Sequence, residues 1–186
     1  GYVPILRTRV FENCNSLVEI VVDPENKNYA SVDGVLYGRN EKGVISKLMV
    51  CPRNKGGVVD IADTVTEIAN KAFYYNKGVT EITFSKGLTS GELSFGRDVF
   101  YMCESLSKVS LPQGLTTIGA GVFYYCESLE EIFIPKTVTL IENNAFNKCY
   151  ALKKIVFEDG YIYKDVVDEE TGETKKEIAN YLEIAD

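Results

Sequence analysis

Apolar residues recur along this chain in a pattern that repeats about every 23 residues. Its clearest markers are phenylalanines at intervals of 27, 23 and 23 residues: Phe73, Phe100, Phe123 and Phe146. The text between them repeats too, as in LTTIGAGVFYYCESLEEIFIP (115–135) and VTLIENNAFNKCYALKKIVFE (138–158). Self-similarity with this period predicts a solenoid, in which each repeat forms one coil that stacks on the next.

About five units share the pattern, and other positions keep a fixed distance from each phenylalanine. An apolar residue lies five positions before it and a cysteine or asparagine three positions after it, as with Ile118 and Cys126 around Phe123. The first unit is centred on Phe11 and lacks its beginning. The third unit carries four extra residues, around residues 90–94, which explains the interval of 27.

Each unit contains stretches typical of strands and one stretch typical of a short helical turn. LEEIFI alternates after its leading leucine, so Ile132 and Ile134 point one way while Glu131 and Phe133 point the other. Stacked coils would align these stretches as the parallel strands of one concave sheet, with the V-x-x-I stretches as a second ladder of short strands. The GAGVFYYC stretch (119–126) is too short for a long helix and predicts a helical turn or a 3₁₀ segment. We therefore expect a β-rich fold of the α/β class.

Two parts of the chain interrupt the repeat. Residues 25–60 contain most of an excess of 39 residues, and GVLYGRNEKGVISKLMVCP (34–52) has two β-rich runs around a glycine-containing turn. This predicts an inserted β-hairpin that protrudes near the N-terminal end of a repeat array over residues 1–160. Residues 161–186 break the repeat and form either a cap on the last coil or the start of a following segment.

The repeat units resemble a known class. IGAGVFYYCESLEEIFIP and IENNAFNKCYALKKIVFE are similar to the BspA-like, or treponemal-type, leucine-rich repeat, and the resemblance covers roughly residues 2–160. The insertion is similar as well, because NKNYASVDGVLYGRN followed by ISKLMVCP resembles the hairpin segment found between repeats of such proteins. The resemblance implies a right-handed leucine-rich-repeat solenoid. It also implies a bacterial protein, secreted or anchored at the cell surface, that binds partners as an adhesin does.

Composition narrows the function classes. The net charge of −7 argues against nucleic acid as a partner, because Lys and Arg side chains supply most of that affinity. The absence of histidine excludes Ser-His-Asp and Cys-His pairs and imidazole zinc sites within this chain. We expect no enzymatic activity, no cofactor and no metal. No run approaches the roughly 18 apolar residues that span a bilayer. The opening Gly1–Pro4 reads as the middle of a repeat, which predicts a piece of a longer protein.

Cysteines occupy one position of the repeat in four units: Cys14, Cys103, Cys126 and Cys149. Asn76 fills the same position in the second unit. Side chains in register on successive coils lie about 4.8 Å apart, whereas a disulfide needs β-carbons roughly 3.8 Å apart. Cysteine is also among the most buried residue types. The pattern favours a reduced, buried column over a disulfide or metal site, and Cys51 lies outside it in the insertion.

Charged residues form an outward column along the predicted sheet: Glu19, Glu81, Lys108, Glu131 and Lys154. Opposite charges on neighbouring strands attract, so the last three form a favourable ladder. Phe133, in the adjoining column, adds an apolar contact. These six residues are our candidate binding face, and the alternative is a solvated face held by weak exposed ion pairs.

Tyrosines repeat at the position after the phenylalanine: Tyr74, Tyr101 and Tyr124. A tyrosine can stack on a sugar ring or anchor an interface, so these residues form a secondary candidate stripe for binding. The alternative, which we favour, is that the rings pack on one another along the array.

The sequence as a whole predicts a non-enzymatic, adhesin-like binding module at the surface of a bacterium or outside it. We expect a monomer that contacts a protein or glycan ligand on host or bacterial macromolecules. The alternative is a structural spacer in a larger surface protein, with no ligand of its own. An enzyme that uses Glu130 and Glu131 ranks last, because adjacent strand residues point to opposite faces.

Overall fold

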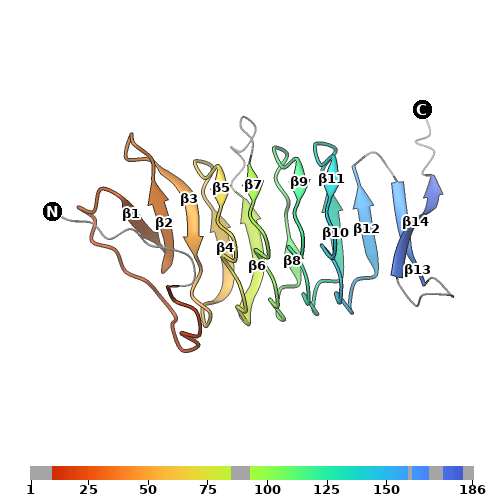
Figure 1. Ribbon diagram of the computed structural model, residues 1–186, viewed down its shortest axis with the longest axis horizontal. Helices are drawn as coiled ribbons and strands as arrows, with labels where there is room; N and C mark the ends of the chain where they lie inside the picture. The colour runs from red at the N-terminus through yellow and green to blue at the C-terminus, as the bar shows by residue number, and fades with distance from the viewer. Residues whose placement is uncertain (1–9, 85–92, 159–160, 168–173, 182–186) are drawn as a thin grey trace.

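The computed structural model describes residues 10–84, 93–158, 161–167 and 174–181. These residues form strands joined by turns, and none of them is helical. Figure 1 shows the strands side by side along an elongated array, with β1 near one end and β14 at the other. The predicted β-rich solenoid is confirmed. The described part of the chain accordingly has no helix with the length and apolar character needed to cross a membrane.

One side of the array carries a parallel ladder that includes the strands after Leu106, Leu129 and Leu152, and we call it the long-strand ladder. Its strands are β4 (Gly56–Ile61), β6 (Gly78–Phe84), β8 (Lys108–Val109), β10 (Glu131–Ile134) and β12 (Lys154–Phe157). β6 pairs in parallel with β4 and β8, β10 pairs in parallel with β12, and β8 and β10 are neighbours. As the alternation predicts, Ile132 and Ile134 are buried while Glu131 and Phe133 are exposed.

A second parallel ladder, the short-strand ladder, runs along the other side. Its strands are β3 (Ile45–Val50), β5 (Glu67–Ile68), β7 (Ser94–Phe95), β9 (Thr117–Ile118) and β11 (Leu140–Ile141). β5 pairs in parallel with β3 and β7, and β9 pairs in parallel with β11. A parallel bridge between Leu93 and Leu115 connects the two groups. The predicted ladder of V-x-x-I strands is therefore confirmed.

The segment around each repeat phenylalanine is a series of turns, so the predicted helical or 3₁₀ segment is wrong. At Phe123, the residues two positions before and after it, Gly121 and Tyr125, have φ of 66° and 61°. The same two positions are left-handed around Phe73, at Lys71 and Tyr75, both with φ of 61°. A left-handed residue twice within five positions prevents the run of right-handed residues that a helix requires.

Hydrogen bonds to the next coil compensate for the missing helical bonds. The N–H groups of Lys71, Phe73 and Tyr75 donate to carbonyls in the Phe100 turn, at 3.0, 2.9 and 2.9 Å. Those carbonyls belong to Arg97, Val99 and Tyr101. We call this repeated set of hydrogen bonds the turn ladder. It supplies backbone partners across coils, as a β-ladder does, at positions where each coil bends.

The repeat phenylalanines form the centre of the core. Phe73, Phe100 and Phe123 are fully buried. Ring centroids of successive members lie 5.0, 5.2 and 5.3 Å apart from Phe73 to Phe146. Burial of each such ring contributes roughly 1.5–3 kcal/mol, so this column stabilises the stacking of the coils.

The insertion covers the N-terminal end of the core and does not protrude as we expected. β1 (Tyr29–Val32) and β2 (Val35–Arg39) form an antiparallel hairpin, and β2 pairs antiparallel with β3. β3 in turn pairs in parallel with β5, so the hairpin continues the short-strand ladder. Val35 and Tyr37, on one face of β2, are 1% and 2% exposed and belong to the core, which places the hairpin's apolar face there. Burial of that face explains why the hairpin lies against the array.

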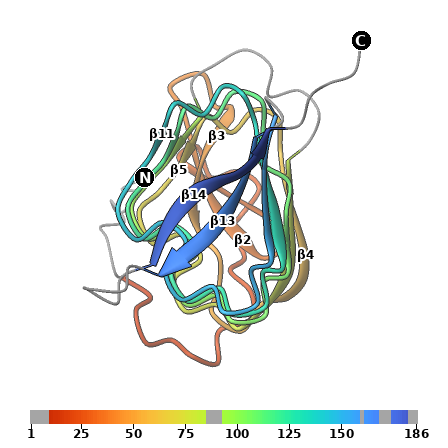
Figure 2. The same cartoon turned by 90° about the vertical axis from the view of Figure 1, so that its right-hand side faces the viewer.

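Residues 45–61 also form a short coil of their own. β3 and β4 flank a corner at residues 51–55, and β4 enters the long-strand ladder beside β6. At the other end, β13 (Tyr161–Val167) pairs antiparallel with β12 and with β14 (Thr174–Tyr181). Figure 2 shows β13 and β14 running across the end of the array. A capping role for residues 161–186 and the boundary at residue 160 stay predictions.

Candidate binding surfaces

Charged residues of the candidate face pair across neighbouring strands of the long-strand ladder. Glu81 lies opposite Lys108, and Glu131 lies opposite Lys154. The Nζ of Lys108 is 2.6 Å from Oε1 of Glu81. One column away, Lys153 Nζ lies 3.1 Å from Oε2 of Glu130. The face therefore has much of its charge balanced within itself.

Glu19 does not join this column. Residues 18–20 form no strand, and Val58 of β4 lies in the position beside Glu81. Glu19 packs instead against the hairpin turn, where a β-carbon on Gly34 would lie 2.8 Å from the β-carbon of Glu19. The coil at residues 45–61 comes between the first unit and Phe73, so it supplies the strand next to β6. Val58 is 53% exposed, and the alternation in VVDI (58–61) could have predicted that it lies on the outward side of a strand.

Phe133 is the large apolar side chain of the face, 47% exposed on β10. Val156 of β12 lies opposite it and is half-buried. Further toward the N-terminus, the same column is polar, and Thr83 Oγ1 lies 2.7 Å from Asp60 Oδ1. This column is therefore polar at Asp60 and Thr83 and apolar around Phe133.

The tyrosine stripe is a stack of rings. The centroids of Tyr74 and Tyr101 are 5.1 Å apart with ring planes at 23°, and those of Tyr101 and Tyr124 are 4.8 Å apart at 9°. Both faces of Tyr101 thus contact another tyrosine, so its edge faces solvent. This geometry favours packing over flat stacking on a sugar ring.

Cations that the sequence analysis did not single out lie at both ends of the stack. The guanidinium of Arg53 lies 5.9 and 5.2 Å from the ring centroids of Tyr74 and Tyr75. Lys148 Nζ lies 5.4 and 4.7 Å from the centroids of Tyr124 and Tyr125. Hydrogen bonds to these two tyrosines raise the pKa of the Lys148 ammonium. Lys148 lies two positions after Phe146, the position that Tyr125 has after Phe123, so the repeat pattern could have placed it near the tyrosines. Arg53 lies in the insertion, where the repeat gives no such signal.

The cysteine column serves the stacking of the coils. The thiols of Cys103, Cys126 and Cys149 each donate to a phenylalanine carbonyl of the preceding coil, at 3.1, 3.2 and 3.0 Å. Burial raises the pKa of the Cys103 and Cys126 thiols well above the usual range, and it raises that of Cys51 to about 12. Such thiols are poor nucleophiles. None of the five cysteines forms a disulfide, and Cys14, which the sequence analysis placed in the buried column, is exposed. The described residues contain no cluster that could hold a metal ion.

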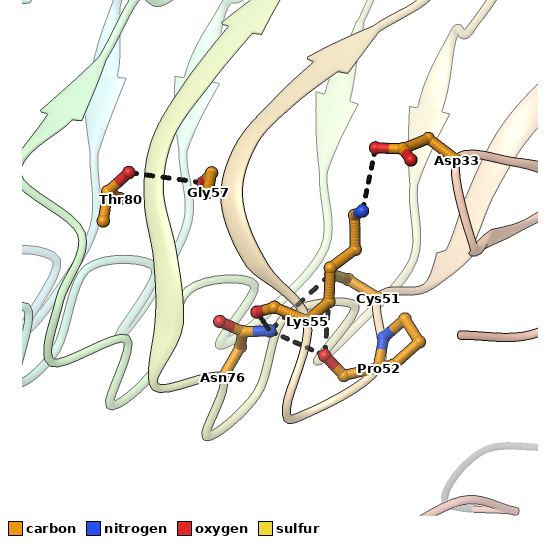
Figure 3. A network of polar contacts seen from close by, with 7 residues as sticks. All are labelled: Asp33, Cys51, Pro52, Lys55, Gly57, Asn76 and Thr80. Carbon is orange, nitrogen blue, oxygen red and sulfur yellow. Dashed lines mark hydrogen bonds and ion pairs between the residues drawn. The ribbon is translucent and has the colours of Figure 1, made fainter. Parts of the chain in front are cut away.

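Asn76 replaces cysteine in this column and connects the array to the corner at residues 51–55. Its Nδ2 donates to the carbonyls of Pro52 and Lys55, at 2.6 and 3.0 Å, as Figure 3 shows. Its Oδ1 accepts from the N–H groups of Gly78 and Val79, at 3.0 and 2.8 Å. The side chain is fully buried and its hydrogen-bonding groups are all used, which is the requirement for an amide in a core.

Known proteins share this repeat. A family model described as the BspA type leucine rich repeat region matches residues 57–166 in six copies. The chain belongs to the BspA-type leucine-rich repeat family. The match begins inside β4, so it includes residues 57–60, which the sequence analysis placed in the insertion. No curated protein matches the chain.

Solved structures resemble this BspA-type chain along most of its length. The pneumococcal vaccine antigen PcpA is 26% identical over 75% of the chain, with a TM-score of 0.64. The chain spans only 33% of the PcpA chain. A leucine-rich repeat protein from Bacteroides capillosus is 26% identical, with 70% of this chain and 99% of that one covered and a TM-score of 0.57. A Treponema pallidum leucine-rich repeat protein, 21% identical over 68% of this chain and 70% of that one, shares the fold with a TM-score of 0.52.

Proposed function

We propose that this protein is a non-enzymatic, adhesin-like module that binds a protein partner through the long-strand ladder, with Phe133 as the anchor. The observation that carries the proposal is the half-exposed aromatic ring of Phe133 on a regular strand face. Protein interfaces are enriched in aromatic side chains, Phe among them, and have a polar rim around their core. Val156 beside it extends the apolar area.

The charges of the face set the kind of partner. Glu131 and Lys154 flank Phe133 on the same two strands and carry opposite signs. A surface that presents both signs around an apolar centre suits a protein partner with complementary charges, and it gives specificity more than affinity. It does not suit nucleic acid, because the chain has a net charge of −7. A protein ligand is preferred to a glycan because the ring faces within the tyrosine stripe contact one another.

The relatives support a location outside the cell. PcpA is described as a vaccine antigen of pneumococcus, and it is similar to this chain over 75% of its length. We therefore place the protein at the bacterial surface or in the secreted fraction, as a monomer. Surface labelling of intact cells of the source bacterium with an antibody against this chain tests the location. Signal confined to lysed cells would contradict it.

A matched pair of variants tests the contact face. Phe133→Ala removes the proposed anchor, whereas Leu140→Ala removes an equally exposed apolar side chain (49% against 47%) from the short-strand ladder. Binding to a panel of purified extracellular proteins, measured by surface plasmon resonance, should fall roughly thirtyfold for Phe133→Ala, the loss of one hot spot, and stay unchanged for Leu140→Ala. Equal effects of the two changes would refute the assignment of the face.

The spacer remains the alternative function, and the ion pairs favour it. Glu81 with Lys108 and Glu130 with Lys153 are already satisfied within the array, so these charges do not require a ligand. A spacer predicts no saturable binding to any member of the protein panel or of a glycan array. Saturable binding that depends on Phe133 excludes it.

A further inference from the structure

The turn ladder repeats in the same way along the array. At the Phe100 turn, three N–H groups donate to the next coil at 3.3, 2.8 and 2.8 Å; they belong to Asp98, Phe100 and Met102. At the Phe123 turn, three N–H groups donate at 3.2, 2.8 and 3.0 Å; they belong to Gly121, Phe123 and Tyr125. Each turn after the first therefore receives three hydrogen bonds on carbonyls that point toward the preceding coil.

This ladder is incomplete at the Phe73 turn. The equivalent carbonyls there belong to Asn70, Ala72 and Tyr74. The Ala72 carbonyl accepts from the N–H of Cys51, at 2.7 Å. Within the described ranges, no N–H or side chain donates to the carbonyls of Asn70 and Tyr74. The donors are missing because the preceding coil, residues 45–61, has only a short corner at Cys51 where the other coils have a full phenylalanine turn. Pro52, in this corner, has no N–H to donate.

A cavity of about 370 Å³ lies where the missing turn would stack. Asn70 and Tyr74, whose carbonyls accept no hydrogen bond from the described residues, both line it. Its other walls are largely apolar and include Phe11, Leu17 and Met49. The Phe11 turn has the sequence of a repeat and could stack on the Phe73 turn as a preceding coil. It lies across the cavity instead, because the N–H of Cys51 already donates to the middle of the three carbonyls, that of Ala72. The volume falls in the range of small-ligand sites.

Among the described residues that line this cavity, basic side chains outnumber acidic ones. They are Lys47, Arg53 and Lys71, against one carboxylate, Glu12, although the chain as a whole is acidic. Lys47 already pairs with Glu67. Arg53 Nη1 lies 3.3 and 2.9 Å from two amide oxygens, those of Asn13 and Asn15. Lys71 Nζ lies 3.9 Å from Oδ2 of Asp98 and 4.4 Å from the ring centroid of Tyr74. In the described segments no carboxylate pairs with the Arg53 guanidinium, so we assign Arg53 as the cation for an anionic ligand.

We propose that this cavity binds a short, extended peptide that carries a carboxylate. The peptide N–H groups donate to the carbonyls of Asn70 and Tyr74, as a preceding coil does elsewhere in the turn ladder. An apolar side chain fills the space beside Phe11 and Met49. The carboxylate pairs with Arg53, whose planar group binds carboxylates in a fixed geometry. An acyl chain would fill the same volume and leave both carbonyls without donors, which argues for the peptide. This site is separate from Phe133 and does not depend on the function proposed above.

Selection from a displayed heptapeptide library on the 186-residue chain tests the proposal. Enriched peptides are synthesised, and their affinity is measured by isothermal titration calorimetry. We expect them to share an acidic group next to an apolar residue. Arg53→Gln should weaken binding roughly tenfold or more, the loss of a charge-assisted hydrogen bond, and Arg53→Lys should weaken it less. Lys148→Gln is the matched control, because Lys148 covers two tyrosines as Arg53 does but lies outside the cavity lining.

A second measurement distinguishes binding at this site from nonspecific binding to the surface. In a ¹³C-labelled sample, peptide binding should shift the carbonyl resonances of Asn70 and Tyr74 and leave that of Ala72 in place, because its donor is already present. Lauric acid serves as the competing probe. The proposal is overturned if no peptide is enriched, if Lys148→Gln weakens binding as much as Arg53→Gln, if neither carbonyl shifts, or if lauric acid binds more tightly than every selected peptide.

Discussion

Replacement of Asn76 should destabilise this protein more than the loss of a cysteine from the same column. Asn76 makes four hydrogen bonds from a fully buried position, two as donor and two as acceptor. Its partners lie both in the corner at residues 51–55 and at the start of β6. Asn76→Ala removes all four bonds at once and leaves buried carbonyl and N–H groups without this partner.

The magnitude follows from those bonds. At about 1 kcal/mol for each hydrogen bond, Asn76→Ala loses about 4 kcal/mol of unfolding free energy. This is a large part of the roughly 5–15 kcal/mol that typical domains have. Asn76→Cys restores the residue of the other coils but should still lose about 3 kcal/mol, because it keeps one weak donor. The control, Cys126→Ala, loses one S–H bond to the Phe100 carbonyl and a small side chain, about 1–2 kcal/mol.

Urea unfolding followed by far-UV circular dichroism measures these free energies. Tyrosine fluorescence gives a second probe, since the chain has 12 tyrosines and no tryptophan. Stacked repeats can unfold in parts. In the Asn76 variants, amide hydrogen exchange should therefore show that Tyr37 and Leu48 lose protection before Ile132 does. If Asn76→Cys is within about 0.5 kcal/mol of the wild type, a range typical of neutral surface changes, the argument from hydrogen bonds is wrong.

Further predictions concern the thiols and the charged face. Ellman's reagent should modify one thiol per native chain quickly, that of exposed Cys14, and fast reaction of several thiols would contradict the buried column. Because burial raises the pKa of the Cys103 and Cys126 thiols, the unfolded chain binds fewer protons above the ordinary thiol pKa of 9.0, and unfolding free energy should fall as pH rises above that value. This fall with pH should be smaller in Cys126→Ala. If the unfolding free energies of the two proteins, measured in urea, fell equally between pH 8 and 10, the buried Cys126 thiol would not be its cause. A double-mutant cycle on Glu81 and Lys108 should give a coupling of about 0–1 kcal/mol that shrinks in 1 M salt, and a coupling above this range or unaffected by salt would contradict weak surface pairing.

Much of the fold could be predicted from local pattern. The alternation around Ile132 sets which side chains face the core, and the spacing of the phenylalanines sets the coil. The cysteine column was predicted as buried and reduced. Cys103, Cys126 and Cys149 are buried and form no disulfide, whereas Cys14 is exposed. These features depend on residues close together in sequence, where the period alone decides the environment.

The turns around the phenylalanines could not be predicted in this way. Tyr75, Met102 and Lys148 adopt left-handed conformations that such residues rarely take. Bonds from one coil to the next accompany this conformation, as between the N–H of Met102 and the carbonyl of Tyr124, at 2.8 Å. No sequence window contains both partners of such a bond, so a short apolar stretch reads locally as a helical turn.

The candidate surfaces, too, have some features that the local sequence decides and others that only the tertiary structure decides. By itself the sequence determined the repeat, its family and the outward position of Glu81, Lys108 and Phe133. The tertiary structure alone decided that β4, rather than the segment around Glu19, lies beside β6, and that the Phe11 turn stands apart from the Phe73 turn. The reason is competition between distant segments for one set of backbone partners. The N–H of Cys51 donates to the Ala72 carbonyl. Asn70 and Tyr74, whose carbonyls then accept no hydrogen bond from the described residues, line the cavity.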